Sequence, residues 1–353
     1  MSYRLREDES TRDGLRRCTR EELESAIHDL TERVQGDPVE GVHEARKSLK
    51  KLRSLLRLAR GSMPASERRR ENSALRDAGR RLSLARDADV KIQALEGIAE
   101  RFAGQFPRTS VDAIRARLAQ ERQVARLELT ASELPAAVAE ELKAALSRVD
   151  GWRLRSGGWK AIGLGLRRGY GDGQKAYLTA RKKPTVTNLH EWRKRAKDLW
   201  YHLRLLEQTA PHTVRAHAQD AHLLTELLGD DHDLAVLHES LLAGRGQVPV
   251  DTAPVLAAIE HRREALQEEA FFLGQRIYAE SPQAFTKRIR AYWKSWLAQS
   301  RAAAAHVPAE LAEATRTATI PAEQLERAPG DARHQPRPDS VEVEQPDATR
   351  AAV

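Results

Sequence analysis

"HEARKSLKKLR" (residues 43–53) places a histidine ahead of five lysines or arginines within the next ten residues. The pattern returns 147 residues later as "HEWRKRAKDLWYHLR" (residues 190–204). The matching positions are His43, Arg46, Lys47, Lys50 and Arg57 in the first copy and His190, Arg193, Lys194, Lys197 and Arg204 in the second. This repetition predicts two similar helices that present similar charged faces.

Apolar residues repeat in step with the basic ones. Their spacing alternates between three and four residues, at Val42, Ala45, Leu49, Leu52, Leu56 and Ala59 and at Leu189, Trp192, Ala196, Leu199, Leu203 and Leu206. Such spacing indicates a helix that packs one face in a bundle. At about 100° per residue the basic stripe lies beside this apolar seam and not opposite it. Its side chains are therefore expected to point into a groove between helices.

The rest of the chain also favours an all-α protein. Only 5% of its 353 residues are aromatic, and helix-forming Leu, Ala, Arg and Glu dominate. Helices are expected at 20–35, 64–85, 109–128 and 133–148, and then at 160–182, 186–209, 211–242, 251–280 and 282–304. The Gly-rich stretch 151–173 is interpreted as the connection between two halves.

A second, weaker repeat supports an internal duplication. "LSLARDADV" (82–90) resembles "LGDDHDLAV" (228–236), which aligns Asp87 with Asp233 where helix ends are expected. We therefore predict two pseudo-symmetric helical lobes, at 10–150 and 151–305. The remaining segment, 306–353, is predicted to be mostly disordered from about residue 321, where it becomes rich in proline.

The charge balance predicts a polyanionic partner. The net charge is +8 and the sequence pI about 9.7. Residues 321–353 hold seven acidic residues against four arginines, so residues 1–320 carry +11. Cys18 is the only cysteine, which excludes an intramolecular disulfide. No apolar stretch approaches the roughly 18 residues of a membrane span, so a cytoplasmic protein is expected.

The chain resembles the CHAD domain, the conserved-histidine α-helical domain. The stretches that carry the resemblance are "VHEARKSLKKLRSLLRL", "ARDADV", "RRGYGDGQKAYLTARKKPT", "LHEWRKRAKDLWYHLRLL" and "LLGDDHDLAVL". It implies two pseudo-symmetric four-helix bundles around a basic central groove that binds inorganic polyphosphate. It also implies a stand-alone binder associated with polyphosphate granules. No catalytic activity is expected, because the sequence has no Walker loop and no G-x-S-x-G or H-E-x-x-H motif.

The candidate polyphosphate-binding residues are the basic stripes and two arginines of a neighbouring helix. They are His43, Arg46, Lys47, Lys50, Arg53, Arg57, Arg76, Arg80, His190, Arg193, Lys194, Lys197 and Arg204. Arginine suits phosphate because its planar fork donates two hydrogen bonds, while lysine adds a mobile point charge. The second copy has Asp198 and Trp200 where the first has Lys51 and Arg53, so the second helix is expected to contribute less.

Other readings of these residues remain open at this stage. The stripes could be solvated helix faces, and the two histidines could only hydrogen-bond their neighbours. A nucleic-acid-binding protein would fit the charge, but stacking aromatics among the basic residues are mostly missing. A His/Asp-dependent phosphate-transfer enzyme would need converging metal-binding carboxylates. Asp230, Asp231 and Asp233 cluster with His232, yet capping or arginine pairing is favoured, and no metal or cofactor is expected.

Overall fold

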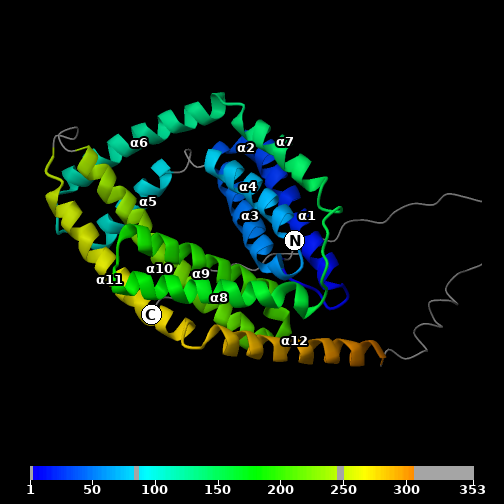
Figure 1. Cartoon of the computed structure of the whole chain (residues 1–353). Coiled ribbons are helices and arrows are strands. Elements are labelled where there is room, and N and C mark those ends of the chain that lie inside the picture. The colour runs from blue at the N-terminus through cyan, green and yellow to red at the C-terminus, as the bar shows by residue number, and fades with distance from the viewer. Residues whose placement is uncertain (1–2, 83–86, 245–249, 306–353) are drawn as a thin grey trace, which may run out of the picture. The chain divides into compact units, whose positions relative to one another are not determined.

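Helices make up all the regular secondary structure in residues 3–82, 87–244 and 250–305, the part of the chain that the computed structural model describes (Figure 1). They are α1 (Thr11–His28), a π-helical turn (Asp29–Arg33), α2 (Val34–Gly36), α3 (Pro38–Leu58), a 3-10 turn (Ala59–Gly61), α4 (Ala65–Arg81), α5 (Asp87–Arg101), α6 (Arg108–Ala131), α7 (Leu134–Leu146), α8 (Trp159–Lys182), α9 (Val186–Leu206), a 3-10 turn (Glu207–Thr209), α10 (Pro211–Ala243), α11 (Ala253–Ile277) and α12 (Pro282–Ala305). The all-α prediction is confirmed.

The two helices that carry the basic stripes, α3 and α9, each begin at a capping side chain. The Asp37 carboxylate accepts hydrogen bonds from the backbone N–H groups of Val39 and Glu40, and Pro38 occupies the first turn of α3. The Thr185 hydroxyl accepts from the backbone N–H of Asn188 in the first turn of α9. These caps satisfy donors that a helix start leaves without an intrahelical partner.

The predicted apolar seams are confirmed on both helices. All six seam positions of α3 and all six of α9 are at most 2% exposed. Trp192 is fully buried, and Trp293 and Trp296 of α12 are also in the core, as expected. Burial of these side chains positions the stripes, because a residue next to the seam lies at the edge of the packed face.

The helix predicted at 160–182 is confirmed as α8 (Trp159–Lys182). Residues 159–173 of the Gly-rich stretch therefore belong to a helix, and their interpretation as a connection was wrong. A Cβ atom on Gly165 would lie 2.0 Å from the carbonyl oxygen of Leu58 in α3. A Cβ atom on Gly169 would lie 2.8 Å from the ring of His202 in α9. Glycine is needed here because only a residue without a Cβ lets α8 approach both stripe helices so closely.

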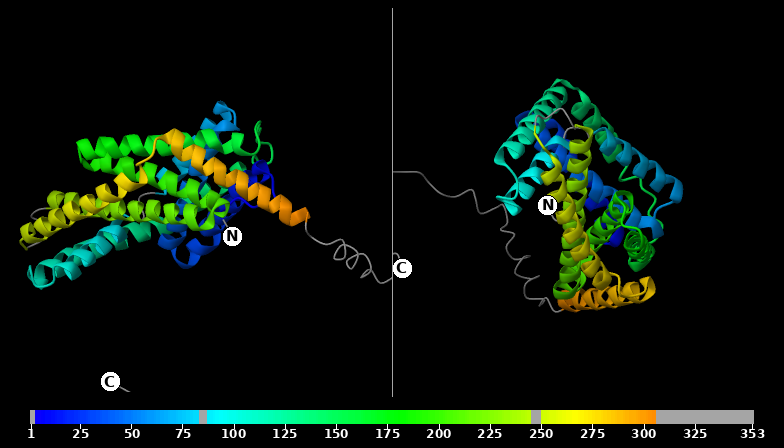
Figure 2. Two further views of the ribbon diagram at one scale, coloured as in Figure 1. Left: turned by 90° about the horizontal axis from the view of Figure 1, so that it is seen from below. Right: turned by 90° about the vertical axis from the view of Figure 1, so that its left-hand side faces the viewer.

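The hydrophobic core has two parts, and each part uses helices from both sides of residue 150. The larger part joins α1, α3, α4 and α7 to α8, α9 and α12 and to parts of α10 and α11. The smaller part joins α5 and α6 to α10 and α11, which lie together in all three views (Figures 1 and 2). The described residues up to Ala302 accordingly form one compact unit. The internal duplication stays a prediction.

Three local expectations differ from the structure. The first helix begins at Thr11, and Tyr3 and Leu5 before it are already buried in the core. Helix α5, at Asp87–Arg101, was not foreseen as an element, whereas Asp233 lies inside the continuous helix α10 and not at a helix end. The predicted disorder of 306–353 lies outside the described residues.

Candidate anion-binding site

Helices α3 and α9 are tied together where they pass each other. The hydroxyl of Ser54 donates a hydrogen bond to the backbone carbonyl of Asp198 (3.2 Å). A ring nitrogen of His202, Nε2, lies 3.0 Å from the backbone carbonyl of Ser54. Arg57 donates to the Asp198 carboxylate at 2.9 Å. Residues from the two copies of the pattern therefore meet at one place.

Around this crossing lies a dense group of guanidinium groups, which we call the arginine cluster. Its members come from α3, the turn after it, α4, α8 and α9, and their charges act on one another. They are Arg53, Arg57, Arg60, Arg68, Arg76, Arg168 and Arg195. The cluster is built mostly from the first copy and its following helix.

Asp198 is the carboxylate at the centre of the cluster. Its side chain is only 10% exposed, and it accepts hydrogen bonds from Arg57 (2.9 Å) and Arg195 (3.3 Å). Asp172, on the exposed side of α8, also attracts Arg60 and Arg195. Glu191 pairs with Arg195 (2.6 Å) and Asp77 with Arg76 (3.0 Å). Four carboxylates thus neutralise part of the charge of seven arginines, and an excess of positive charge remains.

The pKa of Arg53 records this excess. Burial, and then the positive charges of Arg57, Arg76 and Arg195, lower the pKa of Arg53 to about 10 against the opposing effect of Asp198. A guanidinium normally holds its proton far more tightly. The lowered pKa shows that a positive charge is unfavourable at this position. An anion that binds here offsets the cost of desolvation and the repulsion between the arginines.

Arg60 and Arg68 have donors that no described residue uses. The Nε atom of each is buried and has no hydrogen-bond partner among the described residues. Burial, and then neighbouring charges that include Arg168 and Arg57, lower the pKa of both. A buried donor without an acceptor is costly. These two N–H groups are therefore suited to donate hydrogen bonds to the oxygens of an anion.

Three of the predicted site residues, Arg53, Arg57 and Arg76, belong to the cluster. Arg53 also donates to the side-chain oxygen of Asn72 on α4 (3.4 Å). Arg76 lies at the exposed rim and pairs with Asp77 (3.0 Å), on which the charge of Arg80 also acts. The expected contribution of α4 is thus seen at the rim of the cluster.

The other predicted residues have different surroundings. Lys47 pairs with Glu44 (2.5 Å) and Lys194 with the equivalent Glu191 (3.5 Å), so both lysines lie at the outer edge. His43 lies 3.8 Å from Glu44. Their neighbours on α3 are Arg46, which is half-buried, and Lys50, which is exposed.

On α9 the stripe turns toward α10 and not toward the arginine cluster. Lys197 and Arg204 lie over the Trp200 ring, at 5.7 and 5.6 Å from its centroid. Arg193 packs over Gly229 of α10, where a Cβ would come within 2.9 Å of its guanidinium. The structure therefore does not bring the whole of both stripes to one site.

Four cluster members were missed by the sequence analysis, and two of them could have been found. Arg60 continues the spacing of Arg53 and Arg57 by one further step of three residues. Arg68 lies eight residues before Arg76 and twelve before Arg80, and because both distances are multiples of four it lies near their face of the helix. Arg168 and Arg195 belong to the site only because α8 and α9 pack against α3, which no local pattern reveals.

His190 lies against a second histidine of the other repeat motif. Its ring centroid is 4.3 Å from that of His232 on α10. Burial, and then the charges of His232, Lys194 and Arg193, lower the pKa of His190 to about 4. The imidazole is therefore neutral at pH 7 in the absence of a bound anion.

This shift predicts a pH dependence of folding. The pKa of His190 in the folded chain lies below its value of about 6.5 in the unfolded chain. Between these two values the unfolded chain binds a proton at His190 and the folded chain does not. Stability is complete above the unfolded pKa and is lost as the pH falls from about 6.5 toward 4. We expect the free energy of unfolding of the wild type to fall by roughly 1 kcal/mol more than that of His190→Gln between pH 7 and 5, in urea unfolding without polyanions.

The matched control, His212→Gln at an exposed position of α10, should follow the wild type. If the stability of the wild type and that of His190→Gln change with pH in the same way, the pKa of His190 is not lowered in the folded protein.

One acidic residue of the second repeat motif, Asp231, is used in internal contacts. Asp231 is 1% exposed and accepts from Arg263 (3.0 Å) and Gln267 (2.8 Å). Within the described ranges, no three His, Cys, Asp or Glu side chains are grouped so that they could hold a metal ion. None of the described helices has the length and apolarity that a bilayer crossing requires.

Comparison with known proteins identifies the family. Residues 20–242, more than half of the chain, match the family model of the CHAD domain. The chain belongs to the CHAD domain family. All seven residues of the arginine cluster fall inside the region that matches the CHAD domain.

Two solved structures are similar to this CHAD-domain chain. One is PptA from Streptomyces chartreusis, with 15% sequence identity and a TM-score of 0.52 over 77% of this chain and 100% of that chain. The other is the CHAD domain from the plant Ricinus communis, with 19% identity and a TM-score of 0.47 over 83% and 95%. The likeness to the first shows the fold. No curated protein sequence matches this chain.

Proposed function

We propose that the chain binds inorganic polyphosphate at the arginine cluster and does not turn it over. The observation that carries the proposal is the pair of buried Nε donors of Arg60 and Arg68, which have no partner among the described residues and lie near other guanidinium groups whose charges lower the pKa of both. Membership of the CHAD domain family, and the polyphosphate ligand that this resemblance implies, support it.

The recessed position of the donors favours a thin polyanion over a duplex. Arg53, Arg60 and Arg68 are all partly buried. A single linear chain can enter between side chains and present oxygens to these donors, whereas a duplex carries its phosphates on a wide, stiff cylinder. Arginine also matches phosphate oxygens through its planar fork, with no need for base-reading or stacking groups.

Binding without catalysis is part of the same proposal. The carboxylates that face the cluster all pair with arginines or attract them; they are Asp77, Asp172, Glu191 and Asp198. A carboxylate that neutralises arginines is poorly placed to hold a metal ion or to act as a general base. The same chemistry would let the protein coat polyphosphate granules in the cytoplasm.

Competition between polyphosphate and DNA tests this proposal. Long-chain polyphosphate should displace a labelled polyphosphate probe at least about tenfold more effectively than duplex DNA of equal total charge, at 0.15 M salt. The polyphosphate recovered afterwards should keep its length. Equal competition by DNA would favour a nucleic-acid-binding protein instead, and shortened polyphosphate would favour an enzyme.

A further inference from the structure

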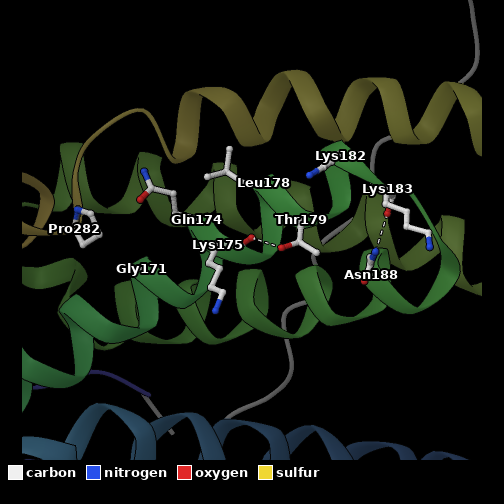
Figure 3. A pocket seen from close by; sticks show the side chains of 9 residues that line it. All are labelled: Gly171, Gln174, Lys175, Leu178, Thr179, Lys182, Lys183, Asn188 and Pro282. Carbon is white, nitrogen blue, oxygen red and sulfur yellow. Dashed lines mark hydrogen bonds between the residues drawn. The ribbon is translucent and has the colours of Figure 1, made fainter.

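A groove of about 710 Å³ lies on the outer side of α8 (Figure 3). It runs from Pro282 at one end to Lys183 and Asn188 at the other, and we call it the α8 groove. Its lining residues are Gly171, Gln174, Lys175, Leu178, Thr179, Lys182, Lys183, Asn188 and Pro282. They include three lysines and no carboxylate, so the charge of the described lining has a single sign.

The polar groups of the α8 groove divide into two kinds. The amide nitrogen of Gln174 donates to the carbonyls of Tyr278 and Glu280 (2.9 and 3.0 Å), and that of Asn188 donates to the carbonyl of Lys183 (2.8 Å). The Thr179 hydroxyl donates to the carbonyl of Lys175 (2.9 Å). These side chains therefore bond to the backbone that forms the walls of the α8 groove, and each of their donor atoms already has an acceptor.

The three lysines of the α8 groove are different. None of Lys175, Lys182 and Lys183 forms an ion pair with a described residue. All three are exposed. Lys47, Lys51 and Lys194, by contrast, pair with a nearby glutamate. The ammonium groups of the α8 groove are thus the polar groups left to meet a ligand.

The α8 groove continues the arginine cluster along the same helix face. Arg168 of the cluster, Lys175 and Lys182 follow one another at intervals of seven residues. Seven residues are nearly two full turns, so the three side chains stay on one side of α8 and rise about 10 Å per step. Asp172 lies between Arg168 and Lys175, but its charge acts on Arg60 and Arg195 of the cluster. A polyanion leaving the cluster past Arg168 meets the lysines next.

We infer that the α8 groove is a second section of the polyanion path, which holds the part of a long linear polyphosphate that extends beyond the arginine cluster. The inference rests on the proposed function and adds a preference for long chains. Forked guanidinium groups fix the chain in the cluster, whereas the lysines act as mobile point charges that follow a flexible chain without fixing its register.

The test compares long-chain polyphosphate with tripolyphosphate, a chain too short to reach both sections. In Lys175→Ala/Lys182→Ala/Lys183→Ala the affinity for long chains should fall about tenfold or more, and its log–log salt slope should become shallower by about two, at roughly 0.7 per lost contact. Binding of tripolyphosphate should not change. The matched control, Lys143→Ala/Lys287→Ala/Lys294→Ala, removes the same charge elsewhere and should behave like the wild type.

Each other outcome overturns the inference in a recognisable way. An equal loss in the control would show a general charge effect, and an equal loss for tripolyphosphate would make the α8 groove a separate short-anion site. Unchanged long-chain binding in the α8 groove variant, together with a loss in an Arg60→Ala/Arg68→Ala variant, would remove the extension but keep the proposed function. No loss in the latter variant would reject the proposed function itself.

Discussion

Replacing Arg60 and Arg68 together by alanine should weaken the binding of long-chain polyphosphate by about 100-fold, since each loses a charge-assisted hydrogen bond worth roughly 1.5 kcal/mol. The log–log salt slope should become shallower by about 1.4, at roughly 0.7 per phosphate contact. Folding should not suffer, because the variant removes two repelling charges and two buried donors without partners. Titration of a labelled chain at several salt concentrations, with the far-ultraviolet circular dichroism as a check on folding, measures all three.

The control removes two arginines from another surface. Arg122 and Arg126 are exposed on α6, near Asp89 and Asp37 (3.8 and 4.0 Å). Arg122→Ala/Arg126→Ala carries the same change of net charge, so only a weak, screened long-range effect should remain. If both double variants lose affinity equally, or neither does, the arginine cluster is not the binding site. Arg46→Ala/Lys50→Ala would then be the next variant to examine.

Much of the fold could be predicted because it depends on local periodicity. The twelve seam positions alternate at three and four residues, and this spacing alone determines which face of each helix is buried. The chemistry that starts the helices is also local, as Asp37 and Thr185 show. The helix at 160–182 was predicted, but its Gly-rich part was also interpreted as a connection between halves, because a glycine required by a close helix contact looks the same in sequence as one that marks a loop.

The site could be predicted only in part, because its residues come from five segments. The step of three from Arg57 to Arg60 and the step of eight from Arg68 to Arg76 were visible in the sequence. The position of Arg195 on its helix was also visible in the sequence. Its place in the arginine cluster was not, because that depends on α9 packing against α3 at Ser54. The separation of the α9 stripe from the arginine cluster likewise follows from packing against α10, which the stripe itself does not encode.

Asp198→Asn should destabilise the free protein and strengthen its hold on polyphosphate. The Asp198 side chain is 10% exposed and faces Arg57 and Arg195 at 2.9 and 3.3 Å. Asparagine keeps the shape but not the charge, so these arginines and Arg53 lose their shared counter-charge in a partly desolvated place. Removing one partner of such a pair typically costs about 3 kcal/mol. Urea unfolding without polyphosphate should show this loss.

A bound phosphate can supply the negative charge that the variant lacks. Affinity for long-chain polyphosphate should therefore rise about tenfold. By linkage, the stabilisation RT ln(1 + [L]/Kd) that a saturating ligand gives should rise by about 1.4 kcal/mol. Unfolding midpoints of wild type and Asp198→Asn should thus approach each other as polyphosphate is added. Asp77→Asn is the matched control, because Asp77 pairs with Arg76 at the exposed rim, and it should change neither property much. If Asp198→Asn instead binds polyphosphate more weakly, the carboxylate holds the arginines in their binding geometry and does not compete with the ligand.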